Sequence, residues 1–264
     1  MPTLVWFNYR RVPAIAYAKR LIEQGKLGEI YQYRAAYLQS WGPRRDPSST
    51  WRFDCSQAGS GAVGDLLSHL IDTAMMLNGP IAELCGMTHT FAHEREVDDA
   101  VFLQTRFRNG SVGTFEATRY AIGYQNRNRF EIHGSRGMIG FNLEDLDRLE
   151  FFDGSAEPPT QGISSILVTG PSHPHAPNFW PPGHIIGYEH TFIATLADFF
   201  DGSPQRSASS REFRGRFGGP PGARSSRRIF RRPRMDFPYR WRSRLRRAAS
   251  LLRNAETKSI GLYH

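Results

Sequence analysis

Cysteine is scarce in this sequence, and long apolar runs are absent from it. The 264 residues include 2 cysteines, Cys55 and Cys85, which lack the spacing of a metal site. They predict reduced thiols and a cytoplasmic protein rather than a disulfide framework. No apolar run approaches the length of a membrane span, and the opening Met-Pro-Thr-Leu-Val is not typical of a signal peptide. We therefore expect neither a membrane protein nor a disulfide-stapled secreted domain.

Acidic residues are scarce in the last 60 residues, and the net charge of +9 arises there. Residues 1–204 hold 17 Lys and Arg against 22 Asp and Glu, a net charge of −5, whereas residues 205–264 hold 17 against 3, a net charge of +14. The first part is mildly acidic, and all of the basic character belongs to the end of the chain. The sequence therefore does not describe a uniformly basic nucleic-acid-binding domain, and nucleic acid is not an expected partner.

Aliphatic residues become rare after residue 204. Residues 205–234 are rich in Arg, Ser, Gly and Pro and have no regular period, so they cannot bury enough apolar surface to offset chain entropy. The composition predicts one domain over residues 1–204 and an Arg-rich tail over 205–264 that is disordered or non-native. Because 16 of the 17 basic tail residues are Arg, a shifted reading frame is one hypothesis. A cationic arm for nucleic acid or anionic lipid is the other.

The period of the apolar residues changes along the first 204 residues. A helical period covers residues 13–24, 65–78 and 184–201. Strand-like stretches, most of them alternating, cover residues 29–40, 81–91, 100–107, 111–120, 127–133, 138–142 and 148–152. Asn109-Gly110, between two of these stretches, is a strong hairpin signal. Consecutive strands joined by tight turns predict an antiparallel sheet, and hence an α+β fold.

Residues 59–64, Gly-Ser-Gly-Ala-Val-Gly, fit two interpretations. The letters match the G-x-G-x-x-G turn of a dinucleotide site, and Glu83 lies at about the distance of a ribose-binding acid. Such a turn must follow a buried strand, however, and residues 51–58 contain no Val, Ile or Leu run. Asp65 would also place a carboxylate where the pyrophosphate binds. We therefore favour the second interpretation, a glycine loop that leads into a helix.

The helix after this loop carries polar residues on one side. With 3.6 residues per turn, Asp65, His69 and Asp72 fall within about 60° of one another. The opposite side is apolar, as in a helix that packs on a core. Lys, Glu and Arg, the usual residues of a solvated face, do not occur between residues 62 and 78. The pattern leaves two alternatives, a functional face and a solvated one.

Several short stretches together resemble the Gfo/Idh/MocA family of oxidoreductases, which includes glucose–fructose oxidoreductase and inositol 2-dehydrogenase. The stretches are Phe7-Asn-Tyr-Arg-Arg-Val-Pro-Ala14, Gly25-Lys-Leu-Gly-Glu-Ile30, Trp51-Arg-Phe-Asp54, Ala58-Gly-Ser-Gly61, Gly64-Asp65-x-x-x-His69-x-x-Asp72 and Trp180-Pro-Pro-Gly-His-Ile-Ile-Gly-Tyr-Glu189. They match the second half of the family's proteins. The resemblance implies an open, mostly antiparallel sheet with helices packed on one face, which supplies the substrate pocket and usually the oligomer interface.

The resemblance also implies roles for individual residues. His69 matches the family's catalytic histidine, a general base that takes a hydroxyl proton, for which an imidazole pKa near neutrality is suited. Asp65 matches the acid that binds substrate hydroxyls and biases the imidazole. The candidates for the substrate pocket, with structural or surface roles as their alternatives, are Asp72, Arg10, Trp180 and His184.

The N-terminal half of the family's proteins, a Rossmann domain that binds NAD or NADP, has no counterpart in the matching stretches. We therefore expect no cofactor-binding and no metal-binding residues in this chain, and a separate Rossmann-domain chain as its partner. The expected function is the substrate-binding and catalytic half of an NAD(P)-dependent sugar or polyol oxidoreductase, inactive alone and able to form homo-oligomers through its sheet. The alternatives are a non-catalytic oligomeric scaffold and a basic-tailed binder of nucleic acid or anionic surfaces.

Overall fold

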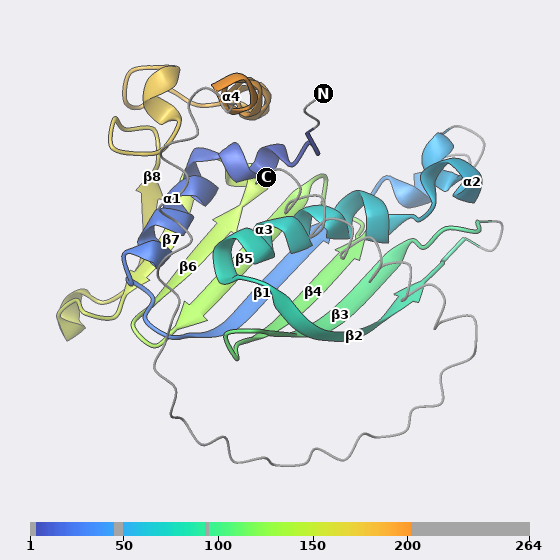
Figure 1. The fold of residues 1–264 in the computed structure, drawn as a ribbon, viewed down its shortest axis with the longest axis horizontal. Coiled ribbons are helices and arrows are strands. Elements are labelled where there is room, and N and C mark those ends of the chain that lie inside the picture. The colour runs from blue at the N-terminus through green and yellow to red at the C-terminus, as the bar shows by residue number, and fades with distance from the viewer. Residues whose placement is uncertain (1–3, 45–49, 93–94, 202–264) are drawn as a thin grey trace, which may run out of the picture. The chain divides into compact units, whose positions relative to one another are not determined.

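The structure is a computed structural model that describes residues 4–44, 50–92 and 95–201. Its central feature is an eight-stranded sheet (Figure 1). The strands are β1 (Ile30–Leu38), β2 (Ile81–His89), β3 (Ala100–Phe107), β4 (Val112–Thr118), β5 (Arg127–Gly134), β6 (Gly137–Asn142), β7 (Arg148–Asp153) and β8 (Ile163–Leu167). The first seven match predicted strands to within a few residues. β8 lies in a stretch where the sequence predicts none.

The strand order is β2-β3-β4-β1-β5-β6-β7-β8. β1 lies between β4 and β5, parallel to the former and antiparallel to the latter. All other neighbouring strands are antiparallel. The predicted open, mostly antiparallel sheet is therefore confirmed, with one parallel pair that local hairpin signals do not reveal.

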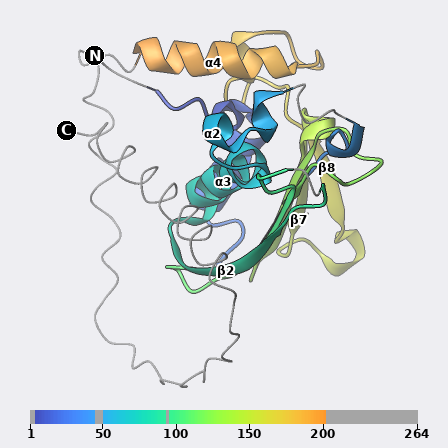
Figure 2. The same ribbon diagram turned by 90° about the vertical axis from the view of Figure 1, so that its right-hand side faces the viewer.

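Helices cover one face of this sheet (Figures 1 and 2). α1 (Pro13–Glu23) and α3 (Ser68–Asn78) lie on that face, and α3 continues from a π-helical turn, η5 (Val63–Leu67). The buried aliphatic residues of the two helices are Ala14, Ile15, Ala18 and Leu21 in α1, and Leu70, Ile71, Ala74 and Leu77 in α3. Beneath them, Tyr33 of β1 stacks on Phe115 and Phe130, with ring centroids 5.7 and 6.0 Å apart. The prediction of helices packed on one face is confirmed.

The short elements before η5 replace the strand that a dinucleotide turn would need. They are a 3-10 turn at Trp51–Phe53 and the one-turn helix α2 (Cys55–Ala58). Asp54 caps α2 by accepting a hydrogen bond from the Ser56 amide at 2.8 Å. The chain thus reaches the glycine loop from a helical turn.

The last helix begins later than its apolar period predicts. α4 spans Tyr188–Asp201, whereas the helical period starts at residue 184. The preceding Ile186 amide donates to the buried carboxylate of Asp147 at 3.1 Å, which fixes that segment in a non-helical conformation. Within the helix, the Thr191 hydroxyl accepts a hydrogen bond from the Asn8 side chain at 2.8 Å. Ile193, part of the predicted apolar stripe, is 52% exposed.

Residues 5–195 form one compact unit. The predicted boundary at 204/205 and the whole Arg-rich tail lie outside the described residues, so the statements about the tail stay predictions. In the part of the chain that the structure describes, no helix has both the length and the hydropathy needed to cross a membrane.

Candidate active site

Asp65 lies in the π-helical turn η5, and His69 lies in the first turn of α3. The wider π turn alters the angular spacing before α3, so an ideal 3.6-residue helix does not describe the position of Asp65 relative to His69 and Asp72. The Ser68 hydroxyl donates to the Gly64 carbonyl at 2.7 Å within this turn. π turns of this kind are frequent at functional sites.

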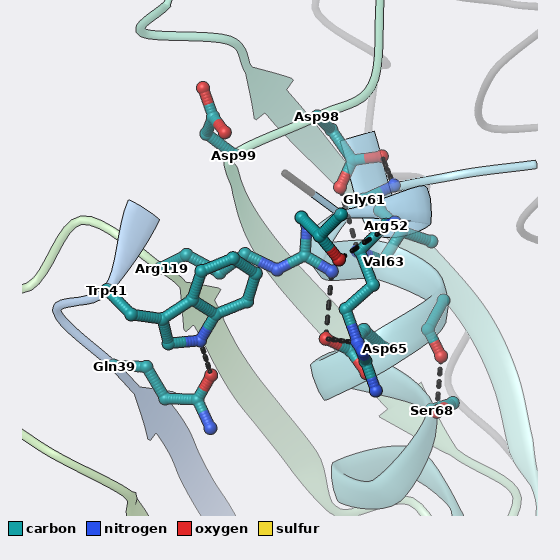
Figure 3. A network of polar contacts seen from close by, with 12 residues as sticks. Gln39, Trp41, Arg52, Gly61, Val63, Asp65, Ser68, Asp98, Asp99 and Arg119 are labelled. Carbon is teal, nitrogen blue, oxygen red and sulfur yellow. Dashed lines mark hydrogen bonds and ion pairs between the residues drawn. The ribbon is translucent and has the colours of Figure 1, made fainter. Parts of the chain in front are cut away.

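Asp98 fixes the glycine loop in front of this turn (Figure 3). Its carboxylate accepts hydrogen bonds from the Gly61 amide at 2.9 Å and the Val63 amide at 2.7 Å. A Cβ on Gly61 would lie only 1.8 Å from the Asp98 carbonyl oxygen, so this close approach requires glycine. In a dinucleotide turn, amides at such a position bind the pyrophosphate. Here a carboxylate already occupies them, and no strand precedes the loop, so the loop does not fit a dinucleotide.

Asp65 is paired with arginine (Figure 3). Nη2 of Arg119 donates to Oδ2 of Asp65 at 2.8 Å, and Nε of Arg52 lies 3.7 Å from the same oxygen. The Arg119 side chain is 1% exposed and its guanidinium lies 4.8 Å from the centre of the Trp41 ring. A buried cation therefore balances the charge of Asp65.

His69 is surrounded by aromatic rings. Tyr9 lies edge-on to it with the ring centroids 4.8 Å apart, and Phe7 and Tyr37 lie at 5.7 and 6.4 Å. Its Nδ1 atom is buried and has no hydrogen-bond partner among the described residues. Burial lowers the pKa of His69, and the nearby Asp65 and Asp72 oppose this shift without reversing it. The imidazole is therefore mostly neutral near neutral pH, as a general base must be.

Asp72 and Arg10, both predicted to bind substrate, bind each other. Nε of Arg10 donates to Oδ2 of Asp72 at 2.8 Å, and Nη2 of Arg10 donates to Oδ1. This two-pronged pairing engages both carboxylate oxygens. The Asp72 side chain is 8% exposed and that of Arg10 is 37% exposed. Of the two, Arg10 is thus the one that retains surface for a ligand.

Trp180 and His184 lie in the loop before α4 and are exposed. Nε1 of Trp180 donates to Nε2 of His190 at 3.2 Å, and Nδ1 of His184 lies 3.0 Å from the Pro181 carbonyl. Neither is hydrogen-bonded to Asp65 or His69 among the described residues. Their assignment to a substrate pocket stays a prediction.

Polar residues that the sequence analysis did not identify extend from the surroundings of His69. The hydroxyls of Tyr9 and Tyr37 share a hydrogen bond of 2.9 Å, and Tyr37 donates to Oδ1 of Asn126 at 2.8 Å. Gln39 donates to the same Asn126 oxygen at 2.7 Å. Burial raises the pKa of Tyr37 to about 12 and raises the pKa of Tyr9 far above its usual value. Both hydroxyls therefore remain protonated near neutral pH.

A separate hollow of about 200 Å³ lies at the β6–β7–β8 end of the sheet. Its lining includes Asn142, Arg148, Glu150 and Ser165. None of the predicted site residues lines it, so it is distinct from the surroundings of His69.

The fold matches the α+β domain of one class of oxidoreductases. The sequence profile described as the GFO/IDH/MocA C-terminal domain matches residues 15–140. This chain therefore belongs to the Gfo/Idh/MocA family through its C-terminal domain.

Levoglucosan dehydrogenase is a homologous relative. The enzyme from Pseudarthrobacter phenanthrenivorans is 38% identical over 234 residues, which cover 80% of this chain and 60% of that protein. A solved structure of levoglucosan dehydrogenase in complex with NADH and levoglucosan is 44% identical with a TM-score of 0.72, covering 75% of this chain and 56% of that one. An oxidoreductase domain protein from Kribbella flavida is 45% identical with a TM-score of 0.70, covering 73% and 54%. The chain thus spans little more than half the length of these relatives.

Proposed function

We propose that this chain is the substrate-binding and catalytic half of an NAD(P)-dependent sugar or polyol oxidoreductase. The observation that carries the proposal is a partly buried His69, ringed by aromatic side chains, whose pKa is lowered by desolvation, with Asp65 one turn earlier in the same helical segment. The homology to levoglucosan dehydrogenase supports a cyclic sugar as the substrate class. A pure scaffold has no physical need of such a pair.

The proposed chemistry assigns one step to each side chain. His69 accepts the proton of the substrate hydroxyl that is oxidised, because a neutral imidazole is a competent base near neutral pH. Oδ1 of Asp65, which has no hydrogen-bond partner among the described residues, accepts a hydrogen bond from a neighbouring hydroxyl, while Oδ2 stays on Arg119. The Tyr9 and Tyr37 hydroxyls line the same region and suit a ligand rich in hydroxyl groups.

The dinucleotide is proposed to be held by a separate polypeptide. The glycine loop does not fit it, since Asp98 occupies the loop amides. Alone, the chain should therefore bind sugar without oxidising it. Homo-oligomers through the sheet are proposed as well, supported by exposed apolar side chains on it: Met87 of β2 and Phe102 of β3, which lie opposite each other, are 48% and 40% exposed.

A titration of the ¹⁵N-labelled chain with levoglucosan, followed by NMR, tests the proposal. We expect saturable shifts at His69 and its neighbours in the wild-type chain, and about tenfold weaker binding in His69→Asn, because leaving one buried hydroxyl of the ligand unpaired costs about 1–3 kcal/mol and about 1.4 kcal/mol corresponds to a factor of ten. His133→Asn is the matched control, since His133 lies on β5 beside Glu131 and away from α3. Equal affinity of the His69 and His133 variants, or no saturable binding of any sugar to the wild-type chain, would overturn the proposal.

A further inference from the structure

Arg119 is a buried charged residue at the edge of the candidate site. It directly follows β4, and its backbone is fixed on both sides: its amide donates to the Asp99 carbonyl at 3.1 Å, and its carbonyl accepts from the Gly42 amide at 2.9 Å. A Cβ on Gly42 would lie 2.8 Å from that carbonyl oxygen, so the contact needs a glycine there. The residue is thus held in place before its side chain makes any contact.

The side chain of Arg119 is only partly satisfied. Nη2 donates to Oδ2 of Asp65, while Nε and Nη1 are buried with no hydrogen-bond partner among the described residues. The guanidinium lies 4.8 Å from the centre of the Trp41 ring and 5.9 Å from that of Phe53, which provides cation–π contacts but no acceptors. Burying a guanidinium with two unmade hydrogen bonds is unfavourable. Such a group is expected where it serves a function rather than stability alone.

The pairing of Asp65 suggests what that function is. A carboxylate close to an imidazole can pair with it, and such a pair stabilises the protonated imidazole. Here the two do not pair: Oδ2 of Asp65 is bound by Arg119, and Nδ1 of His69 has no partner among the described residues. Arg52 is a weaker alternative, because its Nε lies 3.7 Å from Asp65 and its side chain is 42% exposed.

We infer that Arg119 is a positioning residue of the proposed active site: it holds Asp65 away from His69, so that the imidazole stays free to act as a base. The inference rests on the proposed function, because it assigns Arg119 a purpose only if His69 accepts a proton. Arg119 is not itself a catalytic residue, since it acts through Asp65.

Other titratable groups near His69 could also change its pKa. Asp72 on α3 also acts on His69, but Arg10 binds both of its oxygens. Tyr9 and Tyr37 face the imidazole from the first helical turn and from β1, and both stay protonated. Asp65 is therefore the acid whose position a single substitution at Arg119 should change.

A double-mutant cycle on the full chain tests the inference, with the pKa of His69 measured by ¹H–¹⁵N NMR of the imidazole. In Arg119→Met, Asp65 is released to pair with His69, and we expect the His69 pKa to rise by about one unit, the lower end of the effect of a nearby opposite charge. In the Asp65→Asn background the same substitution should produce less than about a third of that shift, because the acid that responds is gone. Arg119→Lys, which keeps the charge, should restore most of the wild-type value.

The controls separate this inference from the proposed function. Arg129→Met removes an arginine that is also paired with carboxylates but lies on the outer face of β5, and it should leave the His69 pKa unchanged. An equal shift in both Asp65 backgrounds, or no shift in Arg119→Met, would overturn the positioning role alone. Equal sugar affinity of the His69→Asn and His133→Asn variants would instead count against the proposed function, and that outcome does not depend on the shift caused by Arg119→Met. Should Arg119→Met not fold, Arg119→Gln replaces it in the same cycle and is judged by the same shifts.

Discussion

Replacing Asp98 with alanine should strongly destabilise the fold around the glycine loop. The Asp98 side chain accepts two amide hydrogen bonds, at 2.9 and 2.7 Å, and the residue is 6% exposed. A hydrogen bond to a charged group contributes about 1.5–3 kcal/mol, and a buried amide left unpaired is penalised further. The two bonds together predict a loss of about 3–5 kcal/mol in the free energy of unfolding. Asp98→Asn keeps one acceptor oxygen and should lose about half of that.

Urea unfolding followed by circular dichroism measures this loss. The matched control is Asp54→Ala, which also removes a carboxylate that caps a helical turn, but an exposed one, so its effect should be far smaller. A loss below about 1 kcal/mol in Asp98→Ala, or equal losses in the two variants, would refute the view that Asp98 anchors the loop. It would also reopen the loop amides to an anionic ligand.

Two further predictions concern the same segment. Because burial lowers the pKa of His69, the unfolded chain binds this proton more readily than the native state, so stability should fall as the pH drops below about 6.5 and level off below the folded-state pKa. Urea midpoints across this range should show the slope in the wild-type chain and lose it in His69→Asn; an unchanged slope would contradict the assigned burial. Gly61→Ala should cost about 3 kcal/mol or more, because its Cβ would meet the Asp98 carbonyl. Gly59→Ala, with open space around it but a φ of +72°, should cost about 1 kcal/mol, and a reversed order in thermal melts would count against the close approach.

Local patterns in the sequence predict much of this fold. β3 coincides with its predicted range, because alternation is unambiguous there: Leu103, Thr105 and Phe107 are buried while Phe102 and Gln104 are exposed. The central place of β1, by contrast, depends on pairing with strands about 80 and 95 residues further along the chain. No local period encodes such a contact.

The candidate site divides in the same way. Asp65 and His69 stand out because short polar residues interrupt an amphipathic helix. Asp98 and Arg119 do not stand out in the sequence. A charged residue is buried where a partner compensates its charge or hydrogen bonds, and the partners of these two residues lie 35 to 54 residues away in sequence. The π turn is also hidden, since Val63–Leu67 has no composition that distinguishes it from an α-helical start.

The most direct test of the account is a pair of calorimetric titrations of the same purified chain, one with levoglucosan and one with NADH. The account predicts saturable heat with the sugar and none with NADH, because the His69 site is present and Asp98 occupies the glycine-loop amides. Micromolar binding of NADH would contradict it, since the loop would then be a dinucleotide site. The chain would in that case have to be assayed as a complete dehydrogenase.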